Sequence, residues 1–308
     1  MTKKKGISIF VAAAAAVLAA SVIRFFLFVS AIDLTTGFYT AEGSAAAGFF
    51  RGLLLALAVL LLALCFIGER RRWTAFTVSS DGLGPKITLF LGGLYLAAAA
   101  VTVFGIVRAE SLSPLSVIDL IGFAAVGLLL MKNTAAPPIA GGIQVGLSLC
   151  LFFRALTLFN GDLVIRNHSD PMLRLLAYVF GSLFFAAAAR CYARLEMKHS
   201  RFREIFLGGL TFLFSGAYTL GKLLAMLFGG NKVLGMEPPD PTAAALFLIS
   251  GGFLAALCFT SQRKEIEYLS GGEKKPKPER SGGGALPQKE ENENSETEER
   301  EYHEAQTD

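Results

Sequence analysis

The chain is dominated by long apolar runs, separated by short segments that contain charged residues, glycine and proline. A run of about 20 apolar residues forms a helix long enough to cross the hydrocarbon core of a bilayer, which is about 30 Å thick. A helix is expected because lipid offers no hydrogen-bonding partner for backbone N–H and C=O groups. The runs predict eight spans, at residues 7–31, 48–68, 87–107, 115–132, 139–159, 172–190, 204–228 and 242–262.

The predicted fold is therefore all-α, a polytopic transmembrane bundle of about eight helices. Composition supports this interpretation, because 53% of the 308 residues are hydrophobic and only 18% are charged. A soluble globular chain is rarely so apolar. We expect the lipid bilayer to be the main partner, and no motif or basic cluster indicates binding of nucleic acid.

The distribution of lysine and arginine predicts the orientation of the bundle. If the N-terminus is cytoplasmic, thirteen of these residues between Lys3 and Arg203 fall in ends and loops assigned to the inside. The loops assigned to the outside hold only three, Arg108, Arg166 and Lys232. Because cytoplasmic loops are enriched in lysine and arginine, we expect both termini on the cytoplasmic side of the cell membrane.

A cleaved signal peptide is the alternative interpretation of the N-terminus. Lys3, Lys4 and Lys5 precede an alanine-rich run with small residues near Ala20, where a signal peptidase could cut. The apolar run continues to Ile32, however, and is longer than the apolar region of a typical signal peptide, which has about 7 to 15 residues. We therefore expect an uncleaved first helix.

Composition changes abruptly after the eighth predicted span. Residues 263–308 are rich in lysine, glutamate and glycine and have few large apolar side chains. Such a segment cannot bury enough surface to offset its chain entropy, so we expect a disordered, charged cytoplasmic tail after a transmembrane domain at residues 1–262. The tail is basic near the membrane and acidic beyond Glu290, which suggests contact with anionic lipid or a cytoplasmic partner. A tail that is merely solvated is the alternative.

A five-residue motif that occurs twice suggests an internal repeat. Phe90–Leu94, near the start of the third span, has the same sequence as Phe206–Leu210, near the start of the seventh, and Arg51 and Arg174 open the second and sixth spans. The copies are offset by four helices, so a duplication would give two parallel four-helix repeats. Chance recurrence in so apolar a sequence is the alternative. The two repeats would be residues 1–135 and 136–262.

Charged residues inside the predicted spans mark a candidate ligand site. Arg24, Arg154 and Lys222 lie toward the outer ends of their spans, where lysine and arginine are normally scarce. Asp119 is a carboxylate at comparable depth. A charge inside the hydrocarbon core costs roughly 3 kcal/mol, so each of these residues needs a partner or a water-filled cavity. They predict a pocket for an anionic group or, as the alternative, structural ion pairs and side chains that reach the headgroup layer.

Polar residues in the seventh span extend this candidate site. Thr211, Ser215, Tyr218 and Lys222 are spaced by four, three and four positions, which places them on one face of a helix. A polar face within lipid is expected to turn toward other helices, where it lines a cavity or forms hydrogen bonds between helices. Tyr218 therefore joins the four charged residues as a candidate for ligand binding. Small residues predict close helix contacts at Gly93 and Ala97, Gly142 and Gly146, and Gly251 and Ala255.

Motifs typical of catalysis or cofactor binding are absent from the sequence. It contains no HExxH, GxSxG or Walker A pattern, and its three histidines are not clustered. The four cysteines lack CxxC spacing and are expected to be small apolar packing residues. We expect no metal and no cofactor, no catalytic residue can be assigned, and no motif of a known family can be placed on these residues.

Three hypotheses about function follow. In the first, which we favour, a non-enzymatic membrane protein binds or transports an anionic or amphiphilic small molecule from the outer face. It predicts that replacing Arg24 or Arg154 by leucine abolishes binding without unfolding the protein. In the second, a membrane-embedded enzyme acts at the outer surface through His168 and Asp170, which lie in one predicted loop. In the third, the protein is a scaffold or assembly subunit whose tail recruits a cytoplasmic partner.

Overall fold

A computed structural model describes the chain at residues 3–33, 39–40, 43–69, 84–109, 113–132, 138–162, 169–192, 200–230 and 237–259. In these parts the structure contains eight helices and no strand, which confirms the predicted all-α fold. The helices are α1 (Lys3–Ser30), α2 (Ser44–Glu69), α3 (Gly84–Ala109), α4 (Pro114–Lys132), α5 (Pro138–Asp162), α6 (Ser169–Tyr192), α7 (Ser200–Phe228) and α8 (Pro241–Phe259).

Seven of the described helices, α1 to α7, are long and apolar enough to cross a membrane. Their apolar stretches contain 19 to 27 residues, and large apolar side chains such as Phe49, Leu55 and Val59 of α2 are exposed. In α8 the stretch with described side chains is shorter, from Pro241 to Ala256. The chain is therefore a multi-pass membrane protein whose exposed helix faces contact lipid, while an eighth span remains a prediction.

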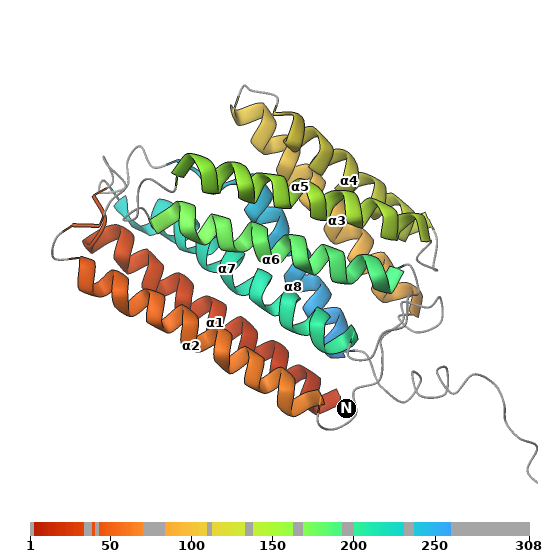
Figure 1. Ribbon diagram of the computed structural model, residues 1–308, viewed down its shortest axis with the longest axis horizontal. Helices are drawn as coiled ribbons and strands as arrows, with labels where there is room; N and C mark the ends of the chain where they lie inside the picture. Colours follow the sequence, from red (N-terminus) through yellow and green to blue (C-terminus); the bar gives the residue numbers. More distant parts are fainter. Residues whose placement is uncertain are drawn as a thin grey trace, which may run out of the picture. The chain divides into compact units, whose positions relative to one another are not determined.

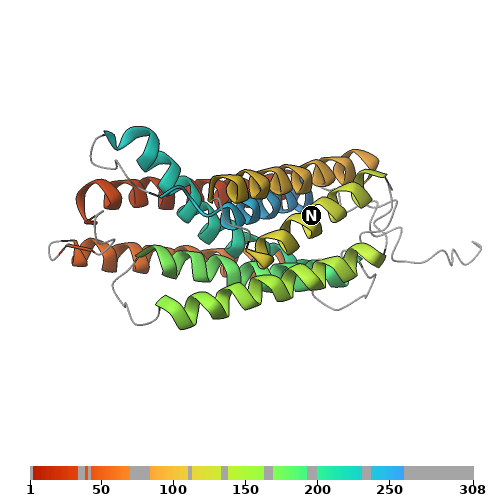
Figure 2. The same cartoon turned by 90° about the horizontal axis from the view of Figure 1, so that it is seen from above.

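Helix α7 lies at the centre of the bundle. It packs against α1, α2, α6 and α8 (Figure 1). In its most apolar 18-residue stretch 72% of the residues are buried, compared with 22% in the corresponding stretch of α2. Helix α8 also packs against α1 and α3, and further neighbouring pairs are α3 with α4, α4 with α5, and α5 with α6 (Figure 2). The polar face predicted for α7 is buried, as expected, and Thr211 and Ser215 are fully enclosed.

Glycines allow the closest contacts between helices, although not at every predicted position. A side chain at Gly92 would meet the backbone oxygen of Gly127 at 3.0 Å, and the reverse contact is equally short, so α3 and α4 cross backbone to backbone. The predicted contact at Gly251 is confirmed, because a side chain there would lie 2.6 Å from the ring of Phe212. The prediction of close helix contacts is wrong at three glycines that face open space: Gly93, Gly142 and Gly146. The sequence shows that these residues are small, but it does not show which way they face.

Proline begins three of the helices, at Pro114, Pro138 and Pro241. Proline suits this position because it lacks the backbone N–H that would have no partner within the helix, and because its fixed φ angle matches the helix. The prolines in the short segments between apolar runs therefore mark where α4, α5 and α8 begin.

Successive helices run in opposite directions, so four connections lie at the same end of the bundle (Figure 1). These connections join α1 to α2, α3 to α4, α5 to α6 and α7 to α8, and we call this end the connector end. It is the end that the distribution of basic residues predicts to face outward. The predicted tail at residues 263–308 lies outside the described residues, and the duplication of residues 1–135 and 136–262 remains a prediction.

Candidate functional site

Asp119 and Arg154 form an ion pair between α4 and α5 near the connector end. Nη2 of Arg154 lies 2.9 Å from Oδ2 of Asp119, whose side chain is completely buried, while the Arg154 side chain is 14% exposed. The same Nη2 donates a hydrogen bond of 3.0 Å to the hydroxyl of Ser116. The other carboxylate oxygen, Asp119 Oδ1, is buried and has no hydrogen-bonding partner among the described residues. The two charges are therefore paired through one carboxylate oxygen.

The N-terminus of α8 is joined to this ion pair. Thr242, in the first turn of α8, donates a hydrogen bond of 3.3 Å to Oδ2 of Asp119. Asp240 precedes Pro241 and acts as the N-cap of the helix, since its carboxylate accepts a hydrogen bond of 3.3 Å from the N–H of Ala243. Aspartate followed by proline therefore starts α8 at the place where its first turn meets Asp119.

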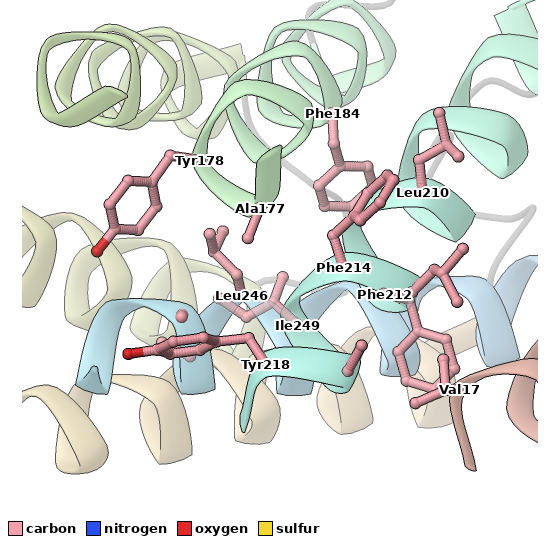
Figure 3. Packing of buried hydrophobic residues seen from close by; sticks show 14 of the residues in the cluster. Val17, Ala177, Tyr178, Phe184, Leu210, Phe212, Phe214, Tyr218, Leu246 and Ile249 are labelled. Atoms are coloured by element: carbon pink, nitrogen blue, oxygen red, sulfur yellow. The ribbon is translucent and has the colours of Figure 1, made fainter. Parts of the chain in front are cut away.

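Two tyrosines connect Asp240 to α6 and α7. The hydroxyl of Tyr178 donates a hydrogen bond to the carboxylate of Asp240, and the N–H of Asp240 donates one of 3.3 Å to the hydroxyl of Tyr218. Figure 3 shows both hydroxyls on the same side of the apolar core. We call the complete set the polar cluster, and it links the five helices α4 to α8. Its members are Ser116, Asp119, Arg154, Tyr178, Tyr218, Asp240 and Thr242.

A cavity of about 1000 Å³ opens beside the polar cluster. It lies between α3, α6, α7, α8 and the segment that leads into α8, and three cations line it: Arg108 of α3, Arg174 of α6 and Lys222 of α7. We call it the cationic cavity. Arg108 is exposed, Arg174 is half-buried and Lys222 is only 6% exposed. Burial so extensive is unusual for a lysine, because the charged group must leave bulk water.

The rest of the cavity wall is largely apolar and aromatic. Phe104 of α3, Met226 of α7 and Phe247 of α8 contribute to it. Tyr218 belongs both to this wall and to the polar cluster, and the ammonium of Lys222 lies 5.1 Å from the centre of its ring. This distance permits a cation–π interaction, so the ring holds the lysine head near the cavity surface.

Two acids also line the cationic cavity, Glu237 and Asp240. The Asp240 carboxylate already accepts hydrogen bonds from Tyr178 and from the start of α8, and Glu237 is exposed. Three cations against two acids leave the lining with a net formal charge of +1. The arrangement is suited to a group with negative charge.

Arg24 lies elsewhere, on the α1 side of α7. Its side chain is completely buried, and Nη1 donates a hydrogen bond of 3.0 Å to the hydroxyl of Tyr39. The guanidinium is 4.5 Å from the centre of the Phe28 ring and 5.7 Å from that of Phe50. A side chain at Gly221 would come within 2.6 Å of Arg24 Cγ, so the arginine packs directly on the backbone of α7. It is not one of the residues that line the cationic cavity.

The five predicted site residues therefore fall into three groups. Lys222 and Tyr218 line the cavity, Asp119 and Arg154 form the adjacent ion pair, and Arg24 occupies a separate aromatic environment. Spacing along a helix does not show which helices are neighbours, so this grouping could not be predicted.

Several residues of the site are not among the predicted ones. From the sequence, Arg108 is only a loop cation and Arg174 only the start of a span, yet both line the cavity. Asp240 lies in a proline-rich turn, although aspartate before proline at the start of an apolar run also indicates an N-cap. Tyr178 has no comparable signal, because tyrosine is common near the ends of membrane spans.

The residues of the enzyme hypothesis are only partly described. His168 lies outside the described residues, and for Asp170 only the backbone, in α6, is described. Among the described side chains, no group of three histidines, cysteines or acids lies close enough together to hold a metal ion. Comparisons of the chain with models of protein families, with curated proteins and with solved structures found no match.

Proposed function

We propose that this multi-pass membrane protein binds an amphiphilic small molecule with an anionic group in the cationic cavity, from the outer face of the cell membrane. The observation that supports the proposal is the convergence of Arg108, Arg174 and Lys222, from three different helices, on one cavity of about 1000 Å³. Ionisable residues within membrane spans are costly and rare, and they usually mark a ligand site or an ion pathway.

The chemistry of the wall favours one class of ligand. Arginine and lysine both bind phosphate and carboxylate groups, arginine through paired N–H donors and lysine as a compact charge. Phe104, Met226 and Phe247 are among the apolar side chains of the remaining wall, and such a wall favours a hydrocarbon portion. A molecule with an anionic head and an apolar body matches both parts of the cavity.

The distribution of basic residues along the sequence supports an outward position of the cavity. The cavity is at the connector end, where Arg51 and Arg108 are exposed, and three further exposed cations, Lys132, Arg190 and Arg203, are at the opposite end together with the predicted basic N-terminus. An end enriched in lysine and arginine is expected in the cytoplasm. Binding from the outer leaflet is therefore part of the proposal.

Thermal unfolding in dodecyl maltoside, a detergent without net charge, tests the proposal. The probes are oleoyl lysophosphatidic acid, which carries a phosphate, and monooleoylglycerol, which has the same chain without it. A ligand that binds only the folded protein stabilises it by about 2.7 kcal/mol at a concentration about 100 times its Kd. We expect the phosphate-bearing probe to raise the unfolding temperature and the neutral probe to leave it unchanged.

Matched variants locate the binding site. Lys222→Met and Arg174→Gln should each remove the stabilisation by the phosphate-bearing probe. Lys132→Met and Arg190→Gln change the same residue types at the opposite end and should retain it. Equal stabilisation of all four variants, or equal stabilisation by both probes, would contradict the proposal.

A further inference from the structure

A second hollow in the bundle differs from the cationic cavity in its chemistry. It has a volume of about 430 Å³ and is lined by Tyr39 and by residues of α2, α6 and α7. We call it the apolar groove. Apart from Arg51 and the hydroxyl of Tyr39, its lining is apolar and includes Leu54, Ala58 and Leu176. The two hollows share no lining residue.

Helix α7 forms the floor of the groove, and α2 and α6 form its sides. Both α2 and α6 pack against α7. The rings of Phe180 from α6 and Phe214 from α7 stack at 5.3 Å and close the wall on one side. Leu55 and Val59 on the other side are exposed, so the groove is open toward the lipid.

Hydrocarbon is the occupant that this lining can accept. A water molecule inside a protein normally makes about two to four hydrogen bonds, and apolar cavities without such partners stay dry and take up apolar molecules. Because the exposed faces of these helices contact lipid, the nearest apolar molecules are the chains of the bilayer itself. An alkyl chain would cover Leu55, Val59 and Leu62 together.

The length of the groove matches one leaflet. Along α2 its lining begins at Phe50 and Arg51 and ends at Leu62, and Arg51 and Leu62 are 11 positions apart. At about 1.5 Å per residue this corresponds to about 16 Å of helix. Half of a hydrocarbon core about 30 Å thick is about 15 Å. An alkyl chain that lies along the groove would therefore cover a length of α2 similar to the thickness of one leaflet.

Arg51 gives the open end of the groove a positive charge. Its side chain is exposed and lies seven residues after the start of α2, at the connector end. Tyr39 adds a hydroxyl at the same end, which accepts a hydrogen bond of 3.0 Å from the buried Arg24. The long side chain of Arg51 can extend from the span toward the headgroup layer, where its guanidinium is suited to a phosphate.

We propose that the apolar groove binds one chain of an anionic phospholipid from the leaflet at the connector end, with the headgroup phosphate beside Arg51. The proposal does not depend on the ligand of the cationic cavity, because the two sites use different residues. This lipid would differ from the other lipids around the bundle in making two specific contacts. Its alkyl chain would lie in the groove, and its phosphate would lie beside Arg51.

Native mass spectrometry of the protein in dodecyl maltoside tests the proposal. Phosphatidylglycerol is titrated against phosphatidylcholine with the same chains, and retained lipids are counted. We expect the groove to retain one phosphatidylglycerol and to retain phosphatidylcholine more weakly. Ala58→Phe fills the groove and should lower the affinity for the retained lipid about fivefold or more. Ala56→Phe adds the same volume at an exposed position outside the groove and should leave that affinity unchanged.

Arg51→Gln tests the headgroup contact, since it should bring retention of the two lipids to the same level. Counting is repeated in the Lys222→Met background, which should remove binding in the cationic cavity and leave the lipid in the groove. Equal retention by Ala58→Phe and Ala56→Phe, both with an unfolding temperature like that of the original protein, would overturn the proposal. A preference for phosphatidylglycerol that survives Arg51→Gln would overturn the role of Arg51.

Discussion

The polar cluster and the cationic cavity lie side by side at the connector end and share Tyr218 and Asp240, but they use charge differently. In the polar cluster, the carboxylate of Asp119 lies 2.9 Å from Arg154, and a hydroxyl of α8 donates to the same oxygen. In the cationic cavity, three cations from three helices line a space of about 1000 Å³. The first arrangement connects helices, and the second places positive charge in the wall of a cavity.

Under the proposed function, this difference separates charges that stabilise the fold from charges that bind the ligand. A buried ion pair contributes to the fold mainly because the loss of either residue leaves the charge of the other uncompensated. A cation in a cavity wall can also interact with an anionic ligand that enters the cavity. Variants in the polar cluster should therefore change the free energy of unfolding, and variants in the cationic cavity should change ligand binding.

Asp119→Leu should have the largest effect. It leaves Arg154 without its counter-ion and removes the acceptor of the Thr242 hydroxyl. Breaking a buried pair typically costs about 3 to 5 kcal/mol, so we expect a loss of about 3 kcal/mol in the free energy of unfolding. Titration with dodecyl sulfate in mixed micelles measures this loss. The double variant Asp119→Leu with Arg154→Leu should recover most of it, since neither charge then remains unpaired. A single variant as stable as the original protein would show that the pair is not structural.

Asp240→Ala should have the second largest effect. It removes the N-cap of α8, which is worth about 1 kcal/mol, and the acceptor of the Tyr178 hydroxyl, which is worth about another 1 kcal/mol. We therefore expect a loss of about 2 kcal/mol in the same titration. Asp240→Asn is the matched control, because asparagine caps helices about as well as aspartate and its side-chain oxygen can accept from Tyr178. If Asp240→Ala and Asp240→Asn lost the same free energy of unfolding, the charge of Asp240, and not its hydrogen bonds, would be the source of the stabilisation.

Arg24→Leu should have an intermediate effect on stability and, in contrast to the prediction from the sequence alone, no effect on binding in the cationic cavity. It removes the hydrogen bond to Tyr39 and the contact with the Phe28 ring, but it also removes a charge from within the membrane. Because these contributions partly offset each other, we expect a loss of about 1 kcal/mol. Stabilisation by lysophosphatidic acid should be retained, since Arg24 does not line the cavity. Loss of that stabilisation in a folded Arg24→Leu protein would extend the binding region to α1.

The fold was largely predictable from the sequence because lipid imposes a simple requirement. Every span needs about 20 apolar residues in a helix, and this pattern is visible without knowledge of the neighbouring helices. The prolines at the starts of α4, α5 and α8 also carry a local signal. The internal repeat, the charged tail and the membrane orientation stay predictions, because no described contact bears on them.

The candidate site was only partly predictable, because hydropathy gives the depth of a residue but not its direction around the helix axis. Arg24 and Lys222 are predicted at similar depth in the membrane. Arg24 contacts α7, and Lys222 is a residue of α7. Only packing shows that Arg24 contacts Gly221 whereas Lys222 lines the cavity. Asp119 could not be predicted as the partner of Arg154, because the sequence does not show that α4 and α5 are adjacent at that level.

Lys222→Met should have the smallest effect on stability and the clearest effect on binding. Methionine keeps most of the apolar stem of the side chain, so packing against neighbouring residues is largely retained. The variant loses the interaction of the ammonium with the Tyr218 ring, which is worth about 0.5 to 2 kcal/mol. It gains by removing a buried charge, whose cost near a membrane interface is less than the roughly 3 kcal/mol at the centre.

The two contributions of Lys222→Met have opposite signs and similar size, so the free energy of unfolding should stay within about 1 kcal/mol of the original value. Stabilisation by lysophosphatidic acid should disappear in the same protein. Lys222→Arg keeps the charge and should retain at least part of that stabilisation. If Lys222→Met instead lost as much stability as Asp119→Leu, the lysine would belong with the ion pair as a structural charge, and the distinction between the polar cluster and the cationic cavity would no longer hold.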